Sequence, residues 1–171
     1  MSGSVVADAS ARVRVRDARG AGDVRVARTL FEEYAASLDV DLGFQGFADE
    51  LASLPGAYAP PAGALLLALR GDAIIGCIAL RPLGDPAARV AEMKRLYVRP
   101  AARGFGVGRV LVEAVVDRAR TLGYREMKLD TLAPMRQARA LYASLGFRPC
   151  EAYYDNPLPG VAYLSLAIGD R

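Results

Sequence analysis

Residues 92–109 read EMKRLYVRPAARGFGVGR, and this stretch contains the pattern that decides the fold. A half-apolar run ending at Val98 leads into a turn with three alternating glycines, Gly104, Gly106 and Gly108, and then into a helical pattern of apolar residues. Glycines at a helix start let the backbone approach a ligand closely, and the unpaired N–H groups there carry roughly half a positive charge. The stretch also holds five cations and only one acid. It therefore predicts a strand, a turn that binds a phosphate or pyrophosphate, and a helix.

The kind of phosphate ligand is narrowed by what the turn lacks. A nucleotide P-loop requires Gly-x-x-x-x-Gly-Lys followed by Ser or Thr, and no such run occurs. A dinucleotide-binding fold is a closer alternative, because Gly104-x-Gly106 follows a strand pattern and Asp130 ends the next one. However, Arg109 stands near the place of the third glycine, and the 41 residues after Asp130 are too few for the remaining strands. A glycine turn without a ligand is the simplest alternative.

The rest of the chain predicts a mixed α/β domain. Period-2 patterns and buried apolar runs predict strands over 12–16, 64–70, 73–80, 91–98, 126–131, 147–154 and 161–168. Helical spacing with capping signals predicts helices over 23–38, 47–54, 107–122 and 134–145. The expected architecture is a central, mostly antiparallel sheet of six to seven strands flanked by four helices, in the order β-α-α-β-β-β-α-β-α-β-β. Residues 1–10 are expected to form a flexible tail, and residues 11–171 a single domain.

The composition excludes several classes of catalyst. The 171 residues include no His, which rules out Ser-His-Asp and Cys-His catalysis and every His-containing metal motif. The two cysteines, Cys77 and Cys150, cannot form a four-thiolate site or a disulfide scaffold. We therefore expect no metal, a reducing compartment and two buried thiols.

Charge and hydropathy narrow the partners. The net charge of +3 is too mild to indicate a nucleic-acid-binding protein, although residues 1–60 carry six Arg against nine acids and the remainder is basic. The longest apolar runs have eight residues, against the ~18 that a membrane-spanning helix needs. With no signal-peptide pattern, we expect a cytoplasmic protein without nucleic-acid or membrane partners. Arg supplies twenty of the 22 basic residues, which is typical of a GC-rich bacterial genome.

Two motifs at their mutual spacing identify a family resemblance. Arg103-x-x-Gly106-x-Gly108 opens a predicted helix, and a later helix reads Ala138-x-x-Leu-Tyr142 before Gly146-Phe147. In both, and in the order of elements from residue 12 to 168, the sequence resembles the GNAT N-acetyltransferase superfamily. The resemblance implies a GNAT-like fold and transfer of an acetyl group from acetyl-CoA to a primary amine of a small molecule or peptide. A non-catalytic acyl-CoA-binding sensor on the same fold is the alternative.

The resemblance also implies which residues bind the cosubstrate. The glycine turn would bind the pyrophosphate, and the strand end at Leu96–Val98 would pair its backbone with the pantetheine arm. The family often has Asn seven residues before the helix tyrosine, and this chain has Met135 there. The expected cosubstrate-binding residues are Leu96, Tyr97, Val98, Arg103, Gly104, Phe105, Gly106, Val107, Gly108, Arg109 and Ala138.

Direct transfer needs a base for the ammonium and an acid for the departing thiolate. Tyr142 resembles the family tyrosine near the CoA sulfur and is the expected acid, with a core aromatic as the alternative. Glu92, eleven residues before Arg103, is the expected base by likeness to histone-type relatives. The alternative for Glu92 is a solvated strand-end carboxylate paired with Lys94 or Arg95, in which case Asp130, Glu151 or a water relay could take the proton. The oxyanion is expected to receive a backbone N–H from Leu96–Val98.

The acceptor site is expected between the first two helices and the last strands. Six acids between Glu32 and Glu50 have no basic residue among them, which favours a cationic amine, with a solvated helix face as the alternative. Related enzymes are commonly dimeric, so a homodimer is one expectation for the assembly. The expected substrate-binding residues are Tyr34, Phe44, Tyr154 and Asn156.

Overall fold

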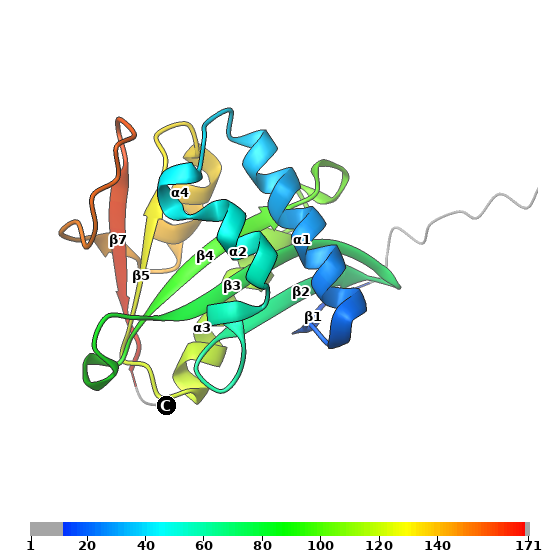
Figure 1. The fold of residues 1–171 in the computed structure, drawn as a ribbon, viewed down its shortest axis with the longest axis horizontal. Helices are drawn as coiled ribbons and strands as arrows, with labels where there is room; N and C mark the ends of the chain where they lie inside the picture. The colour runs from blue at the N-terminus through cyan, green and yellow to red at the C-terminus, as the bar shows by residue number, and fades with distance from the viewer. Residues whose placement is uncertain (1–11, 170–171) are drawn as a thin grey trace, which may run out of the picture.

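The computed structural model describes residues 12–169 and arranges them around one seven-stranded sheet (Figure 1). The strands are β1 (Val13–Asp17), β2 (Ala64–Arg70), β3 (Ala73–Leu83), β4 (Val90–Val98), β5 (Glu126–Thr131), β6 (Arg148–Pro149) and β7 (Ala162–Ala167). The α-helices are α1 (Gly20–Ser37), α2 (Phe47–Ser53), α3 (Val107–Thr121) and α4 (Arg136–Ser144). The sheet order is β1-β2-β3-β4-β5-β7-β6, and only the β4–β5 pair is parallel. The predicted fold class is confirmed, whereas the expected tail over residues 1–10 lies outside the described residues.

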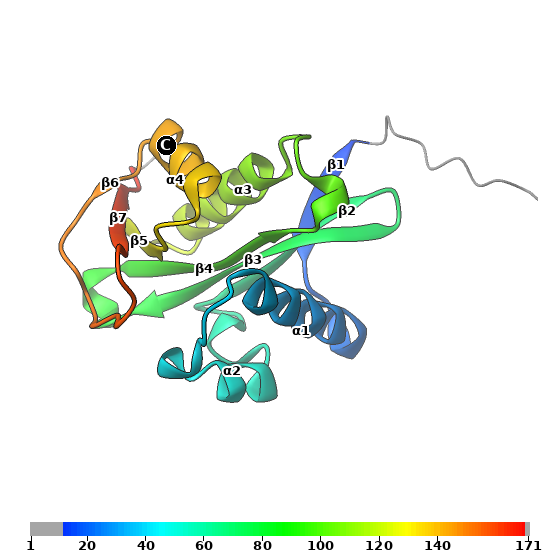
Figure 2. The ribbon, with the colours of Figure 1, turned by 90° about the horizontal axis from the view of Figure 1, so that it is seen from above.

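The helices cover both faces of the sheet, as Figure 2 shows from above. α1 and α2 lie on one face, where a cluster around Leu30, Phe31 and Leu67 is fully buried. α3 and α4 lie on the other face, over a second cluster that includes Leu111 and Met127. The central strands β2 to β4 are therefore covered on both sides, which explains their nearly continuous apolar sequence.

Three sequence predictions need correction. The strand expected over 147–154 is limited to Arg148–Pro149, because Pro149 has no N–H for a sheet ladder and the chain leaves the sheet soon after it. Helix α1 begins at Gly20 rather than at Asp23, whose carboxylate instead accepts the Arg19 backbone N–H at 2.6 Å. Cys77 is buried as expected, but Cys150 is only partly buried; both are free thiols.

Strand β4 contains a bulge and separates from β5 after Glu92. The β3–β4 register places Cys77 opposite Tyr97 and Ala79 opposite Lys94, so β4 holds one extra residue, and Arg95 has a φ of 61°. The parallel pairing of β4 with β5 ends at Glu92 opposite Lys128. Beyond that point the two strands diverge (Figure 1), and the β5-facing edge of β4 has no strand partner among residues 12–169.

The described part of the chain has neither a membrane-spanning helix nor a metal-binding group of side chains. Among residues 12–169, no helix combines the length and apolar character needed to cross a membrane. Within the same range, no group of three or more Cys, Asp or Glu side chains is placed to hold a metal ion.

Candidate functional site

A cleft of about 850 Å³ opens where β4 and β5 diverge. Its walls come from three places: the end of β4 with the glycine turn, the start of α4, and a group of residues around the end of α1. The first wall includes Leu96, Tyr97, Val98, Arg103, Gly104, Gly106, Val107, Gly108 and Arg109. The second includes Pro134, Met135, Arg136, Gln137, Ala138 and Leu141. The third includes Tyr34, Ser37, Leu38 and Val40, with Leu132, Leu158 and Pro159 across from them.

The glycine turn presents a row of free backbone donors to this cleft. Gly104 and Gly106 have φ values of 84° and 75°, which residues with a side chain adopt only at a cost. The first bond into α3 is donated by Val110 N–H to Gly106, so the N–H groups from Gly104 to Arg109 have no acceptor within residues 12–169. Six consecutive donors at a helix start fit an anionic group such as a pyrophosphate.

Neighbouring side chains hold this turn in place. Arg103 donates from Nε to the Val98 carbonyl at 2.9 Å, with its guanidinium 5.8 Å from the centre of the Tyr97 ring. Arg109 donates to Ser144 Oγ at 2.8 Å and so connects α3 with α4. Gly108 lies against the Leu141 side chain of α4, since a Cβ at this position would be 3.4 Å from it.

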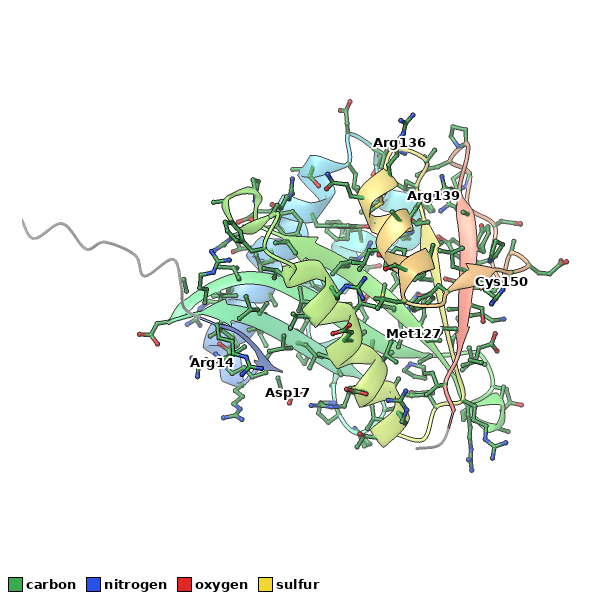
Figure 3. The ribbon with its side chains drawn as sticks, turned by 180° about the vertical axis from the view of Figure 1, so that it is seen from behind. Arg14, Asp17, Met127, Arg136, Arg139 and Cys150 are labelled. Carbon is green, nitrogen blue, oxygen red and sulfur yellow. The ribbon has the colours of Figure 1, made fainter. Side chains whose placement is uncertain are left out.

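The Phe105 side chain of this turn is strongly exposed, at 62%. It lies outside the cleft wall, and the Arg70 guanidinium covers its ring at 4.6 Å from the ring centre. Sequence reasoning missed Arg136 and Gln137, which line the cleft from the start of α4 (Figure 3 labels Arg136 there). Their only sequence signal is their place just before the Ala-x-x-Leu-Tyr motif.

Tyr142 is buried behind the cleft wall, with 4% of its surface exposed. Its ring packs on Phe147 at a centroid distance of 5.7 Å, and its hydroxyl has no hydrogen-bond partner within residues 12–169. Burial raises the pKa of Tyr142, and the nearby Tyr34 and the charge of Asp130 raise it further. The phenol therefore keeps its proton at neutral pH.

Glu92 lies on the β4 segment that still pairs with β5, and its carboxylate is 1% exposed. Arg81 contacts it at 2.7 Å and Lys94 at 3.8 Å. The solvation expected in the alternative for Glu92 is therefore wrong, whereas the pairing with Lys94 that it included is found. Glu92 does not line the cleft.

The predicted substrate residues separate into three groups. Tyr34 lines the cleft. Phe44 is 39% exposed and lies off the cleft wall. Tyr154 and Asn156 lie behind the wall, where the Tyr154 hydroxyl donates to Asp130 Oδ2 at 2.5 Å and Asn156 Nδ2 donates to the same oxygen at 3.1 Å.

The acidic run between Glu32 and Glu50 does not line the cleft. Glu33 pairs with Arg99 at 3.0 Å, Glu50 pairs with Arg95 at 2.8 Å, and no acid of the run belongs to the cleft wall. The argument for a cationic acceptor from this run therefore loses its geometric basis.

A polar network beside Tyr34 was not predicted from the sequence. Arg95 binds both carboxylate oxygens of Glu50 and donates to Gln45 at 3.0 Å, with Tyr34 and Phe47 rings beside its guanidinium. The Gln45 amide in turn donates to the Tyr154 hydroxyl at 3.1 Å. These residues are far apart in the sequence, and no local pattern joins them.

Comparisons with known proteins agree on one family. The model of the acetyltransferase (GNAT) family matches residues 27–147. An uncharacterized N-acetyltransferase of Schizosaccharomyces pombe is 44% identical over 143 residues, covering 82% of this chain and 86% of that protein. An uncharacterized N-acetyltransferase of Escherichia coli K12 is 30% identical over 123 residues, covering 72% of each chain. A fungal and a bacterial relative therefore both match.

Solved structures agree on the fold. A GNAT-family acetyltransferase from Staphylococcus aureus Mu50 superposes with a TM-score of 0.74 at 16% identity, covering 92% of this chain and 100% of that one. A putative acetyltransferase from Salmonella typhimurium, solved with its cofactor acetyl-CoA, gives a TM-score of 0.64 at 19% identity, covering 93% and 95%.

Proposed function

The chain belongs to the GNAT acetyltransferase family and is an N-acetyltransferase, and from that premise we propose that it transfers the acetyl group of acetyl-CoA directly to a primary amine in a ternary complex. The observation that carries the proposal is the row of unpaired N–H groups from Gly104 to Arg109 beside the unpartnered edge of β4. The unpaired N–H groups fit a diphosphate, and the unpartnered strand edge fits the amide-bearing arm of a coenzyme. The Salmonella neighbour with bound acetyl-CoA supports the same reading.

In this proposal, one end of the cleft binds the coenzyme and the other end binds the acceptor amine. The turn and the start of α4, with Arg103, Arg109 and Arg136, bind the phosphates. Leu96, Tyr97 and Val98 bind the pantetheine arm through their backbone, and an N–H of the same segment stabilises the carbonyl oxygen as it becomes negative. The acceptor occupies the end near Tyr34 and Leu158.

The transfer itself needs no enzyme nucleophile. The acceptor ammonium loses one proton, and its nitrogen attacks the thioester carbonyl carbon, whose π electrons move to the oxygen. The carbon–sulfur bond then breaks with its electron pair on sulfur, which takes a proton from the Tyr142 hydroxyl. The phenolate takes the second proton from nitrogen, so the products are an amide, CoA thiol and one released proton. Glu92 as the proton acceptor stays a prediction, and its two cationic partners argue against it.

Release of free CoA thiol with a panel of amines tests the proposal, together with calorimetric titration of CoA. We expect saturable CoA binding and thiol release that depends on the amine. CoA binding without turnover on any amine would favour the non-catalytic sensor instead, and no CoA binding at millimolar concentration would remove the proposal. The cytoplasmic location, the homodimer and the absence of nucleic-acid and membrane partners stay predictions.

A further inference from the structure

Asp130 differs from every other carboxylate of the described chain. Within residues 12–169, each Asp or Glu without a cation inside 4 Å is exposed, except Asp130, which is partly buried at the end of β5. Glu92 and Glu50, its buried counterparts, are both held by cations. A half-buried carboxylate without a cation of the protein inside 4 Å is suited to bind one from a substrate.

Only one oxygen of Asp130 is occupied. The Tyr154 hydroxyl and Asn156 Nδ2 both donate to Oδ2, at 2.5 and 3.1 Å. Oδ1 has no donor within residues 12–169. Neutral donors on Oδ2 orient the carboxylate without neutralising it, so Oδ1 keeps its capacity to accept a proton or bind an ammonium group.

Asp130 is connected to the acceptor end of the cleft from two sides. Asn156, which donates to Asp130, accepts the N–H of Leu158 at 3.0 Å, and Leu158 belongs to the cleft wall. Leu132, which also lines the cleft, follows Asp130 by two residues along the chain. The carboxylate is therefore not itself part of the cleft wall but is connected to it through Asn156 and through the chain that continues to Leu132.

One lysine and five tyrosines interact electrostatically with Asp130. None is a cation within 4 Å: the Lys94 ammonium lies closest to Gln45 Oε1, at 3.4 Å, and to Glu92 Oε1, at 3.8 Å. The charge of Asp130 contributes to the raised pKa of the tyrosines, after the larger effect of burial. The facing groups are Lys94, Tyr34, Tyr142, Tyr153, Tyr154 and Tyr163.

We propose that Asp130, rather than Glu92, binds the ammonium group of the acceptor and takes its proton, and that the acceptor is a primary amine on an apolar body with no carboxylate beside the nitrogen. This inference rests on the proposed acetyl transfer. In the step, the ammonium N–H bond breaks, its proton moves to Oδ1, and the freed lone pair attacks the thioester carbon. The proton later passes to solvent.

The wall at the acceptor end accounts for the rest of the substrate class. Apart from Tyr34 and Ser37 its side chains are apolar, including Leu38, Val40 and Leu158. The nearby Arg95 is occupied by both oxygens of Glu50, so it is not available to a substrate carboxylate. An amino acid would bring its carboxylate toward Asp130, and the cation that faces Asp130, Lys94, already pairs with Glu92 at 3.8 Å.

The test compares 2-phenylethylamine with 2,2-difluoro-2-phenylethylamine, which has nearly the same shape but a far more acidic ammonium. We expect Asp130→Asn to reduce kcat/KM for 2-phenylethylamine about a hundredfold at about pH 8 and to change that for the difluoro amine by less than about fivefold. The affinity for CoA, measured by calorimetry, should be unchanged. The side-chain amide introduced by this substitution can still accept hydrogen bonds from Tyr154 and Asn156 through its oxygen, so the loop contacts are retained.

Two variants separate the role of the charge from a structural role. Asn156→Ala removes the connection between Asp130 and Leu158 but keeps the carboxylate, and it should not produce the difference between the two amines. Glu92→Gln should also treat the two amines alike. Equal losses for both amines in Asp130→Asn, or the selective loss in Glu92→Gln instead, would overturn the assignment.

Phenylalanine tests the substrate class, because it adds a carboxylate to the same apolar body. We expect wild type to prefer 2-phenylethylamine at least about tenfold in kcat/KM. Equal or better use of phenylalanine would overturn the class while leaving acetyl transfer in place. Absence of turnover with every amine, in protein that binds CoA, would instead count against the proposed function.

Discussion

The two ends of the cleft are built in different ways. The coenzyme end consists mainly of one continuous segment, Leu96 to Arg109, and its recognition groups are backbone N–H donors and strand edges. The acceptor end depends on side chains from α1, β4, β5 and the loops around Gln45 and Asn156. A backbone site needs only the correct glycines and a helix, whereas a side-chain site needs several elements to arrive in register. The first is therefore local in sequence and the second is not.

The ends also differ in what holds them together. Around the glycine turn the contacts are largely solvent-exposed, as for Arg103 and Arg109. Behind the acceptor end, buried charges such as Arg95 and Glu50 depend on each other. Loss of one member there leaves the other buried and unpaired, so the acceptor end should be much more sensitive to single changes in charge.

The largest expected effect breaks this buried network. Glu50→Ala leaves the Arg95 side chain, 2% exposed, without its carboxylate, and should lower the free energy of unfolding by about 3–5 kcal/mol. Glu33→Ala is the matched control, because its pair with Arg99 is about one-third exposed and should cost about 1 kcal/mol or less. Urea unfolding measures both. Similar costs for the two variants would contradict the contrast between the two ends.

The next largest effect is expected at Tyr142, the proposed proton donor to the CoA sulfur. Tyr142→Phe should lower kcat about a hundredfold, because it removes the proton donor to sulfur, while the affinity for CoA stays the same. Tyr124→Phe serves as a control, since its hydroxyl donates to the Ala62 carbonyl away from the cleft. Initial rates and calorimetry provide the two readouts. Unchanged turnover in Tyr142→Phe would leave this tyrosine a core aromatic only.

A smaller effect is expected at the backbone site. Gly106→Ala places a side chain at a φ of 75°, which costs about 1–2 kcal/mol unless the turn moves, and should weaken CoA binding about tenfold. Gly84→Ala introduces a comparable φ of 68° in the β3–β4 loop, away from the cleft. Calorimetric titration of CoA should separate the two variants. Equal CoA affinities in both would mean that the turn does not bind the coenzyme through its backbone.

The smallest effect is the acid sensitivity of the α1–α2 layer. The Arg16 hydrogen bond lowers the pKa of Asp23, and for Glu50 the opposing effect of burial is outweighed by Arg95, so its pKa is also lowered. These carboxylates stabilise the fold fully above their unfolded pKa of about 4, and this contribution is lost as the pH falls through the lowered folded values. Asp23→Asn should therefore reduce the stability difference between neutral and acid pH in urea unfolding. An unchanged difference would show that Asp23 does not contribute.

The order of elements could be predicted from the sequence because each depends on local patterns. The run 126–131 is strand β5 as predicted, and Gly123, with a φ of 86°, follows the end of α3. The strand expected over 147–154 was wrong, because Tyr153 and Tyr154 resemble strand residues but lie in a loop, where their rings pack on each other and Tyr154 donates to Asp130. Their environment is decided by β5, which lies more than twenty residues earlier.

The glycine turn of the candidate site could be predicted from the sequence, but the surroundings of the candidate side chains could not. The turn residues line the cleft, apart from the Phe105 side chain, whereas Phe44 lies outside it and Glu92 is held in a buried ion pair. From the sequence, Asp130 was recognisable as a strand-end carboxylate and as one of several alternative acceptors of the proton. Its unoccupied oxygen and the absence of a cation within 4 Å emerge from the packing of β5 against the loop that contains Asn156.

The amino-acid sequence alone determined the family, the sheet and the place where a diphosphate fits, because backbone geometry follows from glycines, apolar periodicity and a helix start. Only the tertiary structure decided which carboxylates have a cation of the protein within 4 Å and that the half-buried Asp130 has none. Charge pairing in a protein interior depends on distances between distant segments, and those distances exist only after the sheet has formed.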